Sequence, residues 1–394
     1  MPSFQATKSR ACGLAETRDF PGLRHHNVSP PTRARCLALP ACSDVKARSL
    51  AKHVPTAIGG VVACTLVFGA FHDVDRARVT ALIAGTGAPL LFALVPQAVS
   101  FVSETMGWQR LVESLGYRLS LLTLLRVRIA TEALSQSLPA GVVWCESMKP
   151  VLLQRHAALP VTAGVGAAAA RKYARLWSHA GYITLAFVLG YATLRRLSRG
   201  VIGIAGLEWF VLATALILIA ASAGMALGLS KSAIAERLHA LLARLPRIGR
   251  RLAERRAGFV ESDAHMARVG GLSPRELVGP VLACLIAWCT ESVETLIVLR
   301  LLGVDVGFGQ ALAIEATVSF VRQLFFFVPA GIGVQDVGYV GFLTALGVPA
   351  ALEAGAAFAL VKRGRELVYT ALGLGLLVAP PLRMQGPAVT ADSA

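Results

Sequence analysis

Long apolar segments separated by short polar stretches run through most of this 394-residue chain. A helix needs about 20 mostly apolar residues to cross the hydrocarbon core of a bilayer, and the segment 209–229 reaches that length without a charged residue. The pattern therefore predicts an all-α, polytopic helical integral membrane protein. Six full spans are expected, at residues 54–71, 79–102, 176–194, 209–229, 277–302 and 367–382.

Composition and charge support this class. Hydrophobic residues make up 55% of the chain and charged residues only 16%, whereas soluble proteins carry about a quarter charged residues. Much of the formal net charge of +16 comes from residues 1–53 and 230–272, which hold nine Lys and Arg each. Basic residues concentrate in cytoplasmic loops, so both blocks and both termini are expected in the cytoplasm. Arg195, Arg196 and Arg199 conflict with this topology, because they would then lie outside.

No motif predicts a cofactor, a metal site or nucleic-acid binding. The seven cysteines include no Cys-x-x-Cys pair, no ATP-binding loop of the Gly-x-x-x-x-Gly-Lys-Ser/Thr type is present, and the basic blocks contain few aromatic residues. The expected organisation is a disordered basic tail over 1–53, a transmembrane domain over 54–382 with a cytoplasmic basic loop at 230–272, and a short tail over 383–394.

An apolar Pro-x-Gly motif occurs twice, at 138–141 and at 328–331. Aligning Pro139 with Pro329 also places Glu104 on Glu294 and Arg175 on Arg365. This register defines repeat 1 over 79–194 and repeat 2 over 277–382, each expected to hold a span, a broken or re-entrant helical hairpin and a second span. Because three crossings separate the repeat starts, the repeats should be inverted, as in many transporters.

A charged stripe precedes each Pro-x-Gly motif. Helical spacing places Glu132 and Arg322 at equivalent positions, seven residues before their prolines, and a close approach of these two groups would offset the cost of burying each charge. A static ion pair that locks the bundle is an equally weighted alternative. The stripes consist of Arg128, Glu132, Ser135 and Pro139 in the first copy and Glu315, Ser319, Arg322 and Pro329 in the second.

The segments after the breaks supply the other candidate binding groups. Freed carbonyls and a new helix N-terminus near Asp336 could hold an anionic headgroup or the Asp336 carboxylate itself. Basic groups before the last span could grip a phosphate, although interfacial anchoring is the better interpretation for Arg171 and Arg363. These candidates are Gly141, Glu146, Gly331, Gly333, Gln335, Asp336, Lys362, Arg365 and Glu366.

The basic loop has two interpretations. Leu238, Leu241 and Leu242 follow helical spacing beside Arg237 and Arg244. This pattern is typical of an amphipathic helix on anionic headgroups, and a solvated loop is an equally good interpretation.

The runs 315–336, 360–367 and 128–139 resemble the motifs of flippase-like membrane proteins related to the lysylphosphatidylglycerol synthase transmembrane region. They are most similar to the hopanoid-biosynthesis-associated, HpnL-like subgroup. The chain departs from that pattern at Trp144-Cys145, where the family usually has two glycines, and at Asp336, where it usually has Glu. The resemblance implies a role in moving or placing hopanoids or other lipids at the bacterial inner membrane.

We therefore expect a lipid transporter or flippase-like protein whose partners are membrane lipids. One alternative is a membrane-embedded lipid-modifying enzyme with Glu132, Glu146 and Asp336 as acids, and another is a scaffold for lipid-synthesis enzymes. An aminoacyl-lipid synthase is not expected, because the twelve residues after Leu382 are too few for its soluble domain. No nucleophile–base set or metal cluster supports catalysis.

Overall fold

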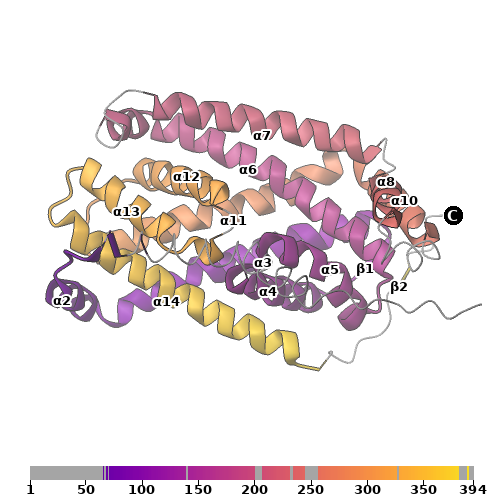
Figure 1. Cartoon of the computed structure of the whole chain (residues 1–394), viewed down its shortest axis with the longest axis horizontal. Helices are drawn as coiled ribbons and strands as arrows, with labels where there is room; N and C mark the ends of the chain where they lie inside the picture. Colours follow the sequence, from indigo (N-terminus) through magenta and orange to yellow (C-terminus); the bar gives the residue numbers. More distant parts are fainter. Residues whose placement is uncertain are drawn as a thin grey trace, which may run out of the picture. The chain divides into compact units, whose positions relative to one another are not determined.

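A computed structural model confirms the all-α class (Figure 1). It describes residues 65, 68–69, 71–138, 141–199, 206–230, 234–244, 256–325, 328–380 and 388–389. The predicted tail over 1–53 lies outside the described residues, as does nearly all of 383–394. The only strands in the described part are β1 (Tyr117–Arg118) and β2 (Ala388–Val389), which pair antiparallel.

Two helix sets follow the expected repeat. The first consists of η1 (Ala88–Ala93), α3 (Leu94–Ser114), α4 (Leu121–Ser137), α5 (Gly141–Ala157) and α6 (Val161–Leu197). The second consists of α11 (Pro274–Leu301), α12 (Phe308–Leu324), η3 (Pro329–Gly331), α13 (Val334–Ala345) and α14 (Ala351–Val378). The long helices α6 and α14 begin at positions that the sequence register aligns, so the register reproduces the order of the elements. α2 (Arg76–Thr86) precedes the first set; α7 (Leu207–Ser230), α8 (Ile234–Ala243) and α10 (Arg256–Gly270) connect the two sets.

Both predicted hairpin breaks are present, but several predicted bounds are wrong. The expected span 79–102 is interrupted at Gly87, which has a φ of 61° and precedes a short 3-10 helix with a proline in its first turn, and the helix then continues as α3 to Ser114. The expected spans 176–194 and 367–382 are the later parts of α6 and α14. Neither helix breaks at its charged cluster because no proline interrupts it, and straight-chain Lys and Arg fit a helix well.

Helices of the first set pack along helices of the second set. α3 packs along α11, α4 packs along α14, and α12 packs along α6. Small residues allow close approach: a Cβ on Gly373 of α14 would lie 2.5 Å from the Ile129 carbonyl oxygen of α4, and one on Gly190 of α6 would lie 3.0 Å from the Ala313 Cβ of α12. Such small-residue contacts are typical of membrane helix pairs. Each broken hairpin is therefore held by the long helix of the other repeat.

Three helices in the described part are long and apolar enough to cross a membrane, namely Ala88–Ser114, Leu207–Ser230 and Pro274–Leu301. In α7, which lies beside α6 (Figure 1), large apolar side chains such as Trp209, Leu216 and Ile217 are exposed. Such an apolar surface suits lipid rather than water. The count of six spans and the inverted orientation stay predictions; the expected span 54–71 lies mostly outside the described residues.

The α4–α14 contact gives a first prediction. Gly373→Val should destabilise the protein by about 1–3 kcal/mol, because the new side chain overlaps the backbone of α4. Gly375→Val is the matched control, since nothing lies within 4 Å of a Cβ at this position. Thermal unfolding in detergent measures both variants, and equal midpoints would show that α4 and α14 do not pack as described.

Candidate functional site

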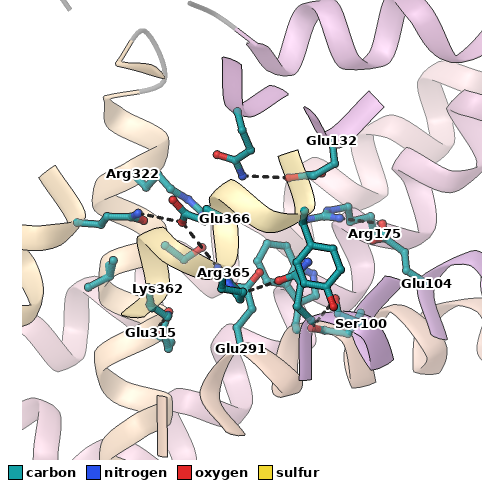
Figure 2. Close-up of a pocket in the computed structure, with 18 of the residues that line it drawn as sticks. Ser100, Glu104, Glu132, Arg175, Glu291, Glu315, Arg322, Lys362, Arg365 and Glu366 are labelled. Carbon is teal, nitrogen blue, oxygen red and sulfur yellow. Dashed lines mark hydrogen bonds and ion pairs between the residues drawn. The ribbon is translucent and has the colours of Figure 1, made fainter. Parts of the chain in front are cut away.

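A polar cavity lies where the two helix sets meet (Figure 2). It encloses about 900 Å³ when its open mouth is included. Side chains from α3, α4 and α6 line it together with side chains from α11, α12, α13 and α14. Its ionisable side chains are Glu104, Glu132, Glu291, Glu315, Glu366, Arg128, Arg175, Arg322, Lys362 and Arg365, together with two tyrosines and a cysteine. The equal numbers of acidic and basic groups allow most of them to be paired.

Glu104 of α3 is the centre of the first ionic network. Its carboxylate is almost fully buried and accepts hydrogen bonds from Arg128 (3.0 Å), Arg171 (2.5 Å) and Arg175 (2.8 Å). Arg128 also bonds Glu132 of its own helix at 2.5 Å. Three guanidinium groups around one carboxylate tie α3, α4 and α6 together, because no helix can move away without leaving a buried charge unpaired.

The second repeat contains the equivalent pair. Glu294 of α11 accepts a 2.5 Å hydrogen bond from Arg365 of α14, and the sequence register aligns this pair with Glu104 and Arg175. Arg365 also donates to the side-chain oxygen of Gln97 in α3 at 2.6 Å. The register therefore identified a real structural equivalence, and the second network crosses from one repeat to the other.

Lys362 is engaged inside the protein. Its ammonium group lies 2.6 Å from a carboxylate oxygen of Glu315 and donates to the Tyr339 hydroxyl at 3.0 Å. Thr295 and Tyr339 also donate to Glu315. The predicted phosphate grip by Lys362 is therefore not what the structure shows, since its charge is already neutralised.

The second break forms a compact cap. Gly331 and Gly333 have φ values of 60° and 81°, which favour glycine, and the Asp336 carboxylate accepts from the Gly333 amide at 2.9 Å. The new helix N-terminus thus holds Asp336, one of the two expected occupants. Arg363 bonds both Asp336 oxygens and Glu366, so its interpretation as an interfacial anchor is wrong. Gln335 donates to Glu366 at 3.2 Å.

The first break is built differently. Pro139 lies outside the described residues, and Gly141 begins α5. A Cβ at Gly141 would lie 2.1 Å from the Ser135 carbonyl oxygen, so only glycine fits. Glu146, the counterpart of Asp336, pairs with Lys149 at 2.7 Å and lies 3.7 Å from Arg171.

Two charged groups of the central cavity remain without a partner. Within the described part of the chain, Arg322 and Glu291 make no ion pair or hydrogen bond, although both are partly buried. The aliphatic stem of Arg322 runs over Gly331, where a Cβ would lie 3.1 Å from the Arg322 Cγ. The expected Glu132–Arg322 pair is therefore wrong: both line the cavity, but Glu132 bonds Arg128 and Gln136 instead.

A second cavity of about 1480 Å³, open mouth included, lies beside the first and shares Glu132, Arg175 and Arg322 with it. Its wall includes the exposed apolar side chains Val142 and Val143 of α5, as well as Leu218 of α7. Basic groups at its inner end and apolar groups at its outer wall suit a molecule with a polar head and an apolar tail. The predicted residues Gly141, Glu146 and Gly331 line this second cavity.

The structure thus brings most of the predicted site residues together. Arg128, Glu132, Glu315, Ser319, Arg322, Gln335, Lys362, Arg365 and Glu366 line the central cavity. Sequence reasoning did not select Glu104, although its duplication as Glu294 was a usable signal. Glu291 is not repeated, but a carboxylate within the predicted apolar span 277–302 was also a usable signal, because charge inside a membrane span is costly.

These features define a helical membrane protein with a charged cavity between two related helix sets. Residues 56–373 match the family described as the lysylphosphatidylglycerol synthase TM region, and the chain belongs to this family. Membership indicates a membrane protein involved in lipid handling. Comparison with curated proteins and with solved structures finds no match.

The Glu104 network gives a second prediction. Glu104→Gln should destabilise the protein by about 3 kcal/mol or more, because three buried arginines lose their shared counter-charge. Glu113→Gln on the same helix is the control, since Glu113 is exposed and has no ion-pair partner in the described part. Chemical or thermal unfolding in detergent compares the two. Similar stability of both variants would contradict the assigned role of Glu104.

Proposed function

We propose that this protein moves lipids between the leaflets of a bacterial cytoplasmic membrane, with the headgroup passing through the central cavity and the tails remaining in the bilayer. Family membership supports lipid as the cargo. The position of the cavity between two related helix sets supports transport, since transporters built from repeats bind their cargo at the repeat interface. The predicted inverted orientation fits the same proposal.

The proposal rests on one observation: two charged side chains in the central cavity have no ion partner within the described part of the chain. The other charged side chains lining the central cavity have ion partners, whereas Arg322 and Glu291 have none within the described part of the chain. An unpaired charge inside a membrane protein is costly and marks a binding group. A guanidinium suits a phosphate, and a carboxylate suits an ammonium group.

This pair of groups favours a lipid whose headgroup carries both charges. The second cavity supports the path of the tail, because its apolar wall leads from Arg322 toward the exposed surface of α5. The similarity of 315–336 to the hopanoid-associated subgroup supports a hopanoid as a further cargo. Lipid-synthesis enzymes in the same membrane are proposed as partners only in the sense that they supply the transported lipid.

Transport in liposomes tests the proposal and gives a third prediction. Purified protein should accelerate leaflet exchange of acyl-labelled phosphatidylethanolamine and phosphatidylglycerol, measured by quenching of the outer-leaflet label. Arg322→Gln should slow both lipids about tenfold or more, the equivalent of losing one charge-assisted hydrogen bond. Glu291→Gln should slow only the ethanolamine lipid, since the glycerol headgroup has no ammonium group. A labelled hopanoid tests the finer assignment in the same vesicles.

Two control variants accompany this assay. Arg78→Gln and Glu113→Gln each remove an exposed charge outside the cavity and should leave the rates unchanged. Unchanged rates in the Arg322 and Glu291 variants, with intact folding, would reject these residues as cargo-binding groups. No exchange by the unaltered protein for any of the three lipids would reject transport of these lipids.

A further inference from the structure

The hairpin α8–α10 has a surface that the transport proposal does not use. α8 begins only four residues after the end of α7 at Ser230, and α7 is long and apolar enough to span the membrane. Four residues reach at most about 14 Å. Chain connectivity therefore keeps the start of α8 close to the membrane–water boundary.

The orientation of α8 is fixed by α10. The Asp263 carboxylate accepts hydrogen bonds from the Ala235 amide (2.9 Å) and the Glu236 amide (2.8 Å), which caps the N-terminus of α8. Glu236 also pairs with Arg256 of α10 at 2.5 Å, and His239 is buried with its ring 5.0 Å from that of Phe259. α10 in turn packs on α6 and α7. The helix is thus held by protein on one side.

Its other side is apolar and basic. Leu238 and Leu241 are 49% and 62% exposed, so the described residues leave both uncovered. Arg237 is also exposed and lies four residues before Leu241, on the same helix face; Arg244, which directly follows the last residue of α8, is exposed as well. Neither arginine has an ion partner in the described part of the chain. Two leucines between two free arginines at the membrane boundary complement an acyl-chain surface with anionic headgroups.

We propose that α8 is an interfacial recognition helix for acidic phospholipids, with Leu238 and Leu241 inserted among the acyl chains and Arg237 and Arg244 bound to the headgroup phosphates. This binding surface is separate from the cavities, because the central cavity and its neighbour contain no described residue of α8 or α10. The sequence pattern left a solvated loop as an equal alternative. The uncovered leucines and the capped, fixed helix favour the membrane.

Hydrogen exchange of the full chain in nanodiscs tests this inference and gives a fourth prediction. The backbone amides of 234–244 should exchange more slowly in nanodiscs with phosphatidylglycerol than in nanodiscs of phosphatidylcholine alone. Arg237→Gln should reduce this difference about fivefold, the equivalent of about 1 kcal/mol per basic residue near an anionic surface. High salt should reduce it in the unaltered protein, because exposed charges are screened.

Leu238→Ser combined with Leu241→Ser should accelerate exchange of 234–244 in both nanodiscs, since the acyl-chain contact is lost. Ala264→Ser, a change at an exposed small residue of α10 outside the proposed surface, is the control and should leave exchange of 234–244 unchanged. Equal exchange of the unaltered protein in both nanodiscs would overturn acidic lipid as the occupant and point to a protein partner. This test is independent of the transport proposal, because hydrogen exchange at 234–244 is measured without any lipid moving between leaflets.

Discussion

The structure depends on charged side chains that are buried among membrane helices and paired with one another. An isolated charge at this depth is expensive, so each buried ion restricts the positions of the helices that carry its partners. Glu104 shows this most clearly, because it joins α3 to α4 and α6 through three arginines. Arg365 of α14 likewise joins its own helix to α11 through Glu294 and to α3 through Gln97. The cavity is therefore bounded by a frame that cannot loosen without leaving a buried charge unpaired.

The broken hairpins complete this frame. Proline and glycine free the backbone where α12 ends, and the freed groups are satisfied by protein rather than lipid. Arg363 donates to the Ala330 carbonyl oxygen at 3.0 Å while it holds Asp336. The break is thus a rigid, hydrogen-bonded cap, and α4 and α12 are placed by their packing on the long helices of the opposite repeat.

The sequence predicted the class, the repeat register and both breaks because these depend on local signals: apolar length, proline with glycine, and a constant register. It failed in assigning side-chain partners. The Glu132–Arg322 pair was inferred from equivalent positions, but equivalence does not place two groups in contact, and Arg128 lies one helical turn from Glu132. Likewise, the partners of Lys362 and Arg363 depend on how α12, α13 and α14 pack, which one-dimensional spacing does not specify.

Comparison of the two helix sets separates the charges that are paired in both from the charges that are not repeated. The ion pair of α3 with α6 recurs between α11 and α14, so it belongs to the inherited architecture. Arg322 has Glu132 as its counterpart, and Glu291 has Phe101, so neither unpaired charge is repeated. Groups required only for stability would tend to recur with the frame they stabilise. Under the transport proposal, the two charges that differ between the copies, and that remain unpaired within the described part of the chain, are therefore the ones best placed to bind a cargo.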